Sequence, residues 1–290
     1  MMKHNIIAAL LLAAVTMMTV GCNKEDNIVP IETKAKVSRI YVTNTTILES
    51  YNDSTQTWDT MYYLPGGRSL NSEFFWTGDR LDSLHKGMNT FHFVYDNRGR
   101  LVNADMDYLQ CFDIEYNTDG NVSRVYKCDL DDGDTVLTET YLYFWSVGKL
   151  QRLESDIWAQ DPSAEALKHE TRFYTWAGDN VTKTVRHNLY LNGKRDTVSY
   201  NYEVNNLANP FYGFPFWQIP YYKMIASFDG TDGLNKNMVT RYYNEKMENQ
   251  FEYTTTSGRV TGIHEVYTTT NPSGLTRSLS VTDYEIEYVN

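Results

Sequence analysis

Apolar and polar residues alternate with a period of two along most of the chain beyond residue 36. In residues 91–95, and again in residues 112–116, aromatic or aliphatic side chains occupy every second position. A period of two is typical of β-strands with one buried face. Since only residues 163–168 could form a single helical turn, the pattern predicts an all-β chain.

A short hairpin unit recurs along this alternating pattern. Three copies place four residues, including a Gly, between a Trp and an aliphatic residue: 76–81, 145–150 and 176–181. Two copies place five residues between a Tyr and the aliphatic residue, 95–101 and 116–122, and a looser copy spans 253–260. In the five-residue copies, Asp96 or Asn117 can accept a hydrogen bond from the backbone two residues on. Gly99 or Gly120 then takes the left-handed conformation that closes a type I turn with a bulge.

Serial hairpins must bury one face and protect their outer edges, and closing the sheet achieves both. The spacing of the units predicts about 14–18 strands in an antiparallel meander closed into a barrel or barrel-like shell. A membrane-spanning barrel has the same alternation. Two observations disfavour it: the chain ends Tyr288-Val289-Asn290 without a terminal aromatic residue, and residues 100–107 carry charge on both strand faces.

The N-terminus has the layout of a bacterial lipoprotein signal. A basic start at Lys3 precedes an apolar run over residues 6–20, which ends in Thr19-Val20-Gly21-Cys22. That ending resembles a lipobox, so we expect residues 1–21 to be a signal peptide and Cys22 to receive lipid. The alternative is an ordinary secretory signal cut nearby. We expect residues 22–36 to form a flexible tether and residues 37–290 the β domain.

The residues that follow Cys22 bear on the localisation of the protein. Asn23-Lys24-Glu25-Asp26 resembles the export tag of surface lipoproteins of the Bacteroidota, although a solvated linker has the same composition. We therefore expect anchoring in the outer membrane with the domain at the cell surface, the periplasmic face being the alternative.

Composition limits the partners of the β domain. A formal net charge of −11 argues against nucleic acid and against a basic patch for a membrane surface. The 23 Tyr, 12 Phe and 6 Trp suit half-buried strands, and they also suit surfaces that bind sugars or peptides.

Residues 208–222 interrupt the hairpin rhythm. Three prolines exclude a central strand through most of this segment. One interpretation is a plug that packs over or into the barrel end, since exposed apolar patches of this size are uncommon. The other is an aromatic platform for a sugar ring or an apolar chain. The candidate ligand-binding residues are Phe211, Tyr212, Phe214, Phe216, Trp217, Tyr221 and Tyr222.

Cys111 and Cys128 lie on the two arms of one predicted hairpin, in a compartment that permits disulfides. A two-residue turn at Asp119-Gly120 would place them opposite each other. The five-residue connection instead pairs Tyr116 with Val122 and would put Phe112, Ile114, Tyr116, Val122 and Tyr126 on one face. That register places the two cysteines on opposite faces and disfavours a disulfide.

The chain shows no catalytic, metal-binding or cofactor signature. Its histidines and cysteines lack metal-ligand spacing, and residues 129–134 resemble a calcium loop less than a solvated turn. The acids Asp105 with Asp107, and Asp113 with Glu115, share strand faces, as strand alternation produces routinely. We therefore expect no enzyme activity, no metal site and no cofactor.

Two resemblances follow from these motifs. The unit at 95–101 resembles the YD repeat of Rhs-type shells. The chain more closely resembles a family of Bacteroidota lipoproteins of unknown function, reported with a porin-like antiparallel barrel. That likeness covers the lipobox, the acidic tag, the serial hairpins and the segment Asn209-Pro210-Phe211-Tyr212-Gly213. It implies an architecture and an address, and no catalytic residues.

Three functions remain open at this point. The first is a lipid-anchored, non-enzymatic envelope lipoprotein that binds a glycan or another envelope ligand. The second is a structural or accessory component that docks onto another envelope protein complex. The third is a hydrolase, which would require two acids to converge in a cleft.

Overall fold

The computed structural model describes residues 36–107, 109–131, 134–158, 165–213, 233–271 and 273–289. The expected signal peptide, Cys22 and the tether up to residue 35 lie outside the described residues. Lys36 belongs with the strand domain: its Nζ donates to the Gly78 carbonyl at 2.5 Å, and its own carbonyl accepts from the Val289 amide at 2.8 Å. No helix in the described ranges is long and apolar enough to cross a membrane.

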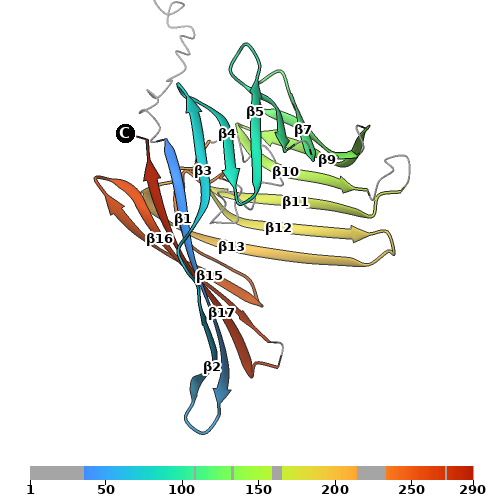
Figure 1. Cartoon of the computed structure of the whole chain (residues 1–290). Coiled ribbons are helices and arrows are strands. Elements are labelled where there is room, and N and C mark those ends of the chain that lie inside the picture. The colour runs from blue at the N-terminus through green and yellow to red at the C-terminus, as the bar shows by residue number, and fades with distance from the viewer. Residues whose placement is uncertain are drawn as a thin grey trace, which may run out of the picture. The chain divides into compact units, whose positions relative to one another are not determined.

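The described residues form strands and turns, as the alternation predicts (Figure 1). The strands are β1 (Val37–Asn52), β2 (Thr57–Pro65), β3 (Ser69–Thr77), β4 (Arg80–Lys86), β5 (Asn89–Tyr95), β6 (Leu101–Met106), β7 (Gln110–Tyr116), β8 (Val122–Asp131), β9 (Asp134–Ser146), β10 (Lys149–Ile157), β11 (Lys168–Ala177), β12 (Asn180–Tyr190), β13 (Arg195–Ala208), β14 (Asn237–Tyr243), β15 (Met247–Thr256), β16 (Arg259–Thr270) and β17 (Thr276–Tyr288).

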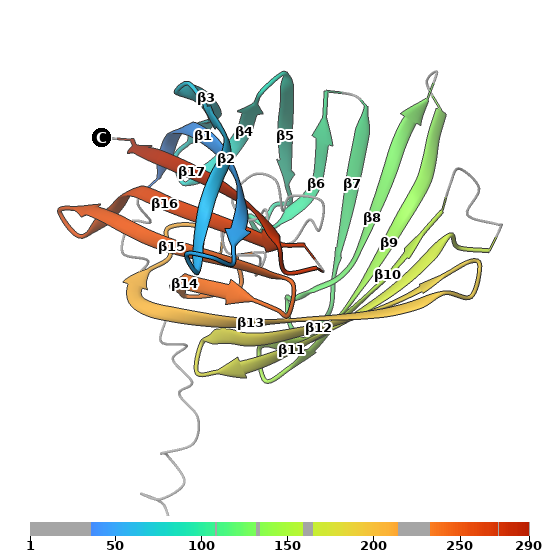
Figure 2. The ribbon, with the colours of Figure 1, turned by 90° about the horizontal axis from the view of Figure 1, so that it is seen from below.

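The strands form one closed antiparallel sheet. From β3 to β17 each strand pairs with the next along the chain, and β17 pairs with β1. The first half of β1 pairs with β3 and its second half pairs with β2, so β2 and β3 share one position in the ring. The 17 strands therefore make a barrel of 16 positions, and Figure 2 shows them following one another around it. The predicted all-β antiparallel barrel is confirmed.

The predicted turn chemistry is also confirmed. The Asp96 Oδ1 atom accepts from the Arg98 amide at 2.9 Å, and Gly99 has a φ of 77°. In the next copy, the Asn117 Oδ1 atom accepts from the backbone two residues on, and Gly120 has a φ of 82°. A side chain would be strained at that φ, so the Gly in each unit follows from the backbone conformation.

The aromatic residue that begins each hairpin unit lies at one end of the barrel, which we call the aromatic rim. Each donates its indole N–H or phenol O–H to a backbone carbonyl of a neighbouring strand: Trp76 to Val37, Tyr95 to Leu81, Tyr116 to Leu101, Trp145 to Val122, Trp176 to Leu150 and Tyr253 to Val239. Tyr288, at the end of β17, donates in the same way to the Val260 carbonyl. Several of these acceptors are the aliphatic residues that end the preceding unit. The repeat therefore links each of these hairpins to the preceding one by a hydrogen bond. Burial raises the pKa of Tyr95 and of Tyr116 to about 12, and both therefore stay neutral donors.

The two faces of the sheet differ in chemistry. Buried side chains face the enclosed interior, and they are apolar near the aromatic rim, as at Tyr174, and polar farther along the same strand, as at Glu170. The outer face carries ion pairs along its strands, Arg39–Glu73 and Glu203–Arg241, and hydrogen-bonded His–Asp contacts, Asp156–His169 and His264–Asp283. Exposed apolar side chains also lie on this face, among them Val94, Phe173 and Leu189.

One predicted register is wrong in part. Tyr116 does pair with Val122, as expected, but Ser123 forms a β-bulge, so that Glu115 pairs with Arg124. An extra residue in one strand reverses the faces beyond it. Cys111 therefore lies directly opposite Cys128 on the outer face, and Tyr126 pairs with Asp113 on that face instead of joining the apolar one.

Candidate ligand-binding site

The segment that links β13 to β14 returns to the aromatic rim through a cluster of asparagines. The Asn209 amide nitrogen donates to the Lys236 carbonyl at 2.9 Å, and its Nδ2 donates to the Asn235 carbonyl at 3.0 Å. The Asn209 Oδ1 atom accepts from the Phe211 amide at 2.9 Å, which forms the turn that an Asn before a Pro favours. These bonds bring residues 209–213 and 233–237 together.

Asn235 contacts Val181 at the aromatic rim. Val181 ends the unit that begins at Trp176, and the residues at this position in other units accept a hydrogen bond from an aromatic side chain. The Asn235 Oδ1 atom accepts from the Val181 amide at 2.5 Å, and its Nδ2 lies 3.5 Å from the Val181 carbonyl. Both residues are fully buried. The segment is thus bound to the barrel at the aromatic rim.

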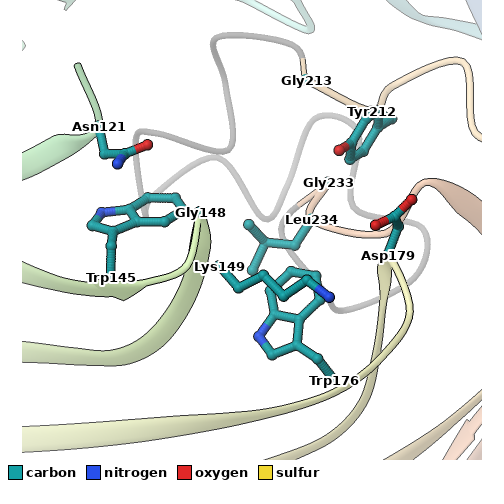
Figure 3. Close-up of a pocket in the computed structure, with 10 residues that line it drawn as sticks. All are labelled: Asn121, Trp145, Gly148, Lys149, Trp176, Asp179, Tyr212, Gly213, Gly233 and Leu234. Carbon is teal, nitrogen blue, oxygen red and sulfur yellow. The ribbon is translucent and has the colours of Figure 1, made fainter. Parts of the chain in front are cut away.

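A pocket of about 220 Å³ lies between this segment and the neighbouring hairpin turns (Figure 3). Its polar lining comes from Asn121 in the β7–β8 turn, Lys149 at the start of β10 and Asp179 in the β11–β12 turn. Its aromatic lining comes from β9, β11 and the linking segment. The lining residues are Asn121, Trp145, Gly148, Lys149, Trp176, Asp179, Tyr212, Gly213, Gly233 and Leu234.

The two tryptophans are held by their rim hydrogen bonds. Trp145 Nε1 donates to the Val122 carbonyl at 2.7 Å, and Trp176 Nε1 donates to the Leu150 carbonyl at 2.8 Å. Each bond fixes one edge of an indole, while both rings remain only partly buried and contribute to the pocket wall. Rigid aromatic surface costs little conformational entropy when a ligand binds.

Charged groups lie beside this aromatic surface. The Lys149 ammonium lies 5.7 Å from the centre of the Trp176 ring and donates to the Gly178 carbonyl. The Asp179 carboxylate is exposed and lies 3.2 Å from the Lys236 ammonium. Asn121 and Tyr212 add an amide and a phenol to the lining (Figure 3). An apolar wall with a few placed polar groups is typical of a small-molecule site.

The structure places two of the sequence-predicted site residues. Tyr212 is 41% exposed and lines the pocket. Phe211 is 2% exposed and belongs to the core, so it is not available to a ligand; the Asn209 turn directs its neighbour Tyr212 outward instead. The other candidates lie outside the described residues: Phe214, Phe216, Trp217, Tyr221 and Tyr222.

Sequence reasoning missed Trp145, Trp176, Lys149 and Asp179. Both tryptophans occupy the same position in successive hairpin units, so adjacent strands bring them to the same rim. The sequence signal that could have identified the two tryptophans was the occurrence of two successive units that begin with Trp and have a four-residue turn. The contribution of Leu234 had no local signal, because it depends on where the linking segment returns.

The acids singled out in the sequence have local roles in the sheet. The Asp107 Oδ2 atom accepts from the Thr90 amide at 2.6 Å, and the Asp113 Oδ1 atom accepts from the Asn103 amide group at 2.8 Å. Burial raises the pKa of Asp105, with a further rise from Asp107. Within the described ranges, no three metal-ligating side chains come together.

Comparisons with known proteins concern the fold. No family model and no curated protein matches the chain. Among solved structures, the chain is similar to a porin-like protein from Bacteroides uniformis, with 14% sequence identity and a TM-score of 0.46, over 87% of this chain and 96% of that one. A second structure, TcdB2-TccC3-TEV, has 9% identity and a TM-score of 0.19 over 79% of this chain, which spans only 20% of that chain.

The class that the fold defines is a closed antiparallel β-barrel built from serial hairpins.

Proposed function

We propose that this protein is a non-enzymatic lipoprotein that binds a glycan in the pocket at the aromatic rim. The observation that carries the proposal is the meeting of Trp145, Trp176 and Tyr212 with an acid, an ammonium group and an amide around one small space. A sugar ring has an apolar C–H face that packs on an aromatic surface. Its hydroxyl groups donate to a carboxylate and accept from an ammonium or amide group.

The size of the pocket indicates how much of a glycan it holds. Its volume of about 220 Å³ lies below the roughly 300 Å³ at which sites for drug-sized ligands begin. A single ring or the end of a chain therefore fits better than an extended polysaccharide lying along the surface.

The proposed localisation rests on the N-terminal motif. Lipid on Cys22, followed by the acidic tag, would hold the domain at the outer membrane facing the cell surface. The Arg39–Glu73 and Glu203–Arg241 ion pairs on the outer face of the barrel support this arrangement, because a tethered domain is surrounded by water.

Glycan binding is expected to raise the unfolding midpoint of the mature chain carrying Cys22→Ser. Plant, mucin and bacterial oligosaccharides would be screened by thermal unfolding. A ligand at 100 times its dissociation constant stabilises by about 2.7 kcal/mol. We expect Tyr212→Ala and Asp179→Ala each to weaken binding at least tenfold, by about 1.4 kcal/mol or more, without changing the midpoint of the unliganded protein.

Tyr62→Ala is the matched control, because Tyr62 is an exposed tyrosine on β2, outside the pocket lining. It should bind the glycan like the parent protein. No midpoint shift with any oligosaccharide, or a shift that both pocket variants retain, would overturn the proposal.

The hairpin formed by the second half of β1 and by β2, residues 45–65, favours a second candidate function, docking onto another envelope protein. Within the described residues β2 pairs with β1 alone, so one edge of β2 lacks a neighbouring strand (Figure 1). Its residues Met61, Tyr62, Tyr63 and Leu64 are 61%, 52%, 58% and 53% exposed. Proteins usually guard such an edge with charge or proline. The occupant that fits is an extended strand of a partner protein, which would pair with the free backbone groups.

A photo-crosslinking residue at position 62 in living cells is expected to yield one discrete adduct with a different protein. Lysines at positions 61 and 63 should abolish that adduct, because charge on the edge disfavours strand addition. Val185→Lys, on the outer face of β12, should leave it unchanged. Absence of an adduct, or adducts that contain only this chain, would exclude docking to a partner protein.

A further inference from the structure

Cys111 and Cys128 lie directly opposite each other on β7 and β8. Both are free thiols in the structure, and Cys128 is 7% exposed while Cys111 is more accessible. The two thiols lie within hydrogen-bonding reach of each other. This pair lies on the outer face of the barrel and does not line the aromatic-rim pocket.

The ladder around the pair shows which kind of cross-strand site it is. The Leu130 amide donates to the Leu109 carbonyl at 2.8 Å, so residues 109 and 130 form a hydrogen-bonded pair. Hydrogen-bonded and non-hydrogen-bonded pairs alternate along an antiparallel ladder. Cys111 and Cys128, two positions further on, are therefore also a hydrogen-bonded pair. Cα atoms of such pairs lie about 5.5 Å apart, inside the range that a disulfide spans.

We propose that Cys111 and Cys128 form a reversible cross-strand disulfide. Side chains of a hydrogen-bonded pair are less closely apposed than those of a non-hydrogen-bonded pair. A bond formed there is more easily reduced than an ordinary structural disulfide. The pair is thus a covalent cross-link between β7 and β8 that forms under oxidising conditions and is broken by reduction.

The oxidant is a disulfide, either a small one such as oxidised glutathione or that of an oxidoreductase. The Cys111 thiolate attacks one sulfur of that disulfide, forms a mixed disulfide and releases the first thiol. The Cys128 thiolate then attacks the Cys111 sulfur and expels the second thiol. Two protons and two electrons leave the cysteine pair, and one external disulfide becomes two thiols.

The surroundings of the pair make this exchange slow at neutral pH. Burial raises the pKa of the Cys111 thiol to about 12, with further rises from Cys128 and Asp113. Burial also raises the pKa of Cys128, and Asp113 and Asp129 contribute to the rise. Asp105 lies opposite Cys111 on β6, and His92 lies opposite Asp105 on β5. The thiolate fraction, and with it the rate of oxidation, should rise about tenfold per pH unit between pH 7 and 9.

Mass spectrometry of the mature chain carrying Cys22→Ser, exposed to oxidised glutathione and then quenched with acid, tests the proposal. We expect the parent protein to lose two hydrogen atoms, to show no thiol after denaturation without reductant, and to regain both thiols with dithiothreitol while folded. Cys128→Ser should stop at a mixed disulfide of Cys111 with glutathione, because no second thiol resolves it.

Cys111→Ser should react far more slowly than Cys128→Ser, since the remaining thiol is buried. Two thiols in the parent protein after prolonged exposure at pH 9 would overturn the proposal. A parent protein that accumulates the same mixed disulfide as Cys128→Ser would overturn it as well.

Discussion

Replacing Glu170 with Gln is expected to lower the free energy of unfolding by about 3–5 kcal/mol, the cost of breaking a buried ion pair. The Glu170 side chain is 11% exposed and lies on the inner face of β11. Its carboxylate accepts from Arg172 at 2.7 Å and from Lys168 at 2.9 Å, and Arg186 lies 3.9 Å away. Glutamine would leave these cations without a counter-charge in a buried place.

The same carboxylate should make the stability of the domain depend on pH. Burial alone would raise the pKa of Glu170, but the charge of Arg172 and the hydrogen bonds from Lys168 and Arg172 outweigh it and hold the pKa at about 2. Because this pKa lies below the ordinary value near 4.5, the stabilisation is fully present above pH 4.5 and is lost as the pH falls towards 2. The shift corresponds to about 3 kcal/mol.

Urea unfolding of the parent protein and Glu170→Gln at pH 7, 4 and 2.5 measures both effects. The difference between the two proteins should shrink as the pH falls, because the carboxyl group of the parent becomes protonated. Glu252→Gln, on the exposed face of β15, should unfold within about 0.5 kcal/mol of the parent at pH 7. A Glu170→Gln protein that is as stable as the parent at pH 7 would contradict the role assigned to this carboxylate.

Replacing Asn235 with Ala is expected to cost about 2–3 kcal/mol of unfolding free energy. The change removes the acceptor of the Val181 amide, and Val181 is fully buried, so water cannot replace the lost bond. It also removes the contact between the Asn235 side chain and the Val181 carbonyl. Residues 233 and 234, which line the pocket, should be less firmly placed, and glycan affinity should fall together with stability.

Chemical unfolding and glycan titration of Asn235→Ala test this coupling. Asn201→Ala, on the outer face of β13, provides the control and should change stability by less than about 0.5 kcal/mol. A variant that loses stability but binds as the parent does would show that the asparagine cluster holds the fold without shaping the pocket.

The hairpin turns could be predicted because they are local. Asp96 or Asn117 accepts a hydrogen bond from the backbone two residues on, and the left-handed Gly follows within the same few residues. No distant residue changes that geometry, so the residue types alone specify the turn. The same holds for the strand faces in β5 and β7, where alternation matched burial.

The face of the sheet on which a residue lies depends on every β-bulge between that residue and the nearest hairpin turn. Ser123 and Thr138 are extra residues in β8 and β9, and neither leaves a mark in the hydrophobic pattern. The bulge at Ser123 is sufficient to bring Cys128 opposite Cys111, although the pairing of Tyr116 with Val122 was predicted correctly. The period-two pattern therefore does not reveal where an extra residue shifts the faces of a strand.

Sequence alone determined that this protein is an all-β chain of serial hairpins, with Gly, Asp and Asn closing the turns and an aromatic residue opening each unit. It also marked residues 208–222 as a break in that repeat. Only the tertiary structure decided that Asn235 contacts Val181 at the rim, that Tyr212 faces a pocket while Phe211 enters the core, and that Trp145 and Trp176 line the same pocket. The physical reason is that turns and strand faces follow from interactions between near neighbours in the chain, whereas the pocket depends on where the segment between β13 and β14 returns to the aromatic rim, beside residues distant in the sequence.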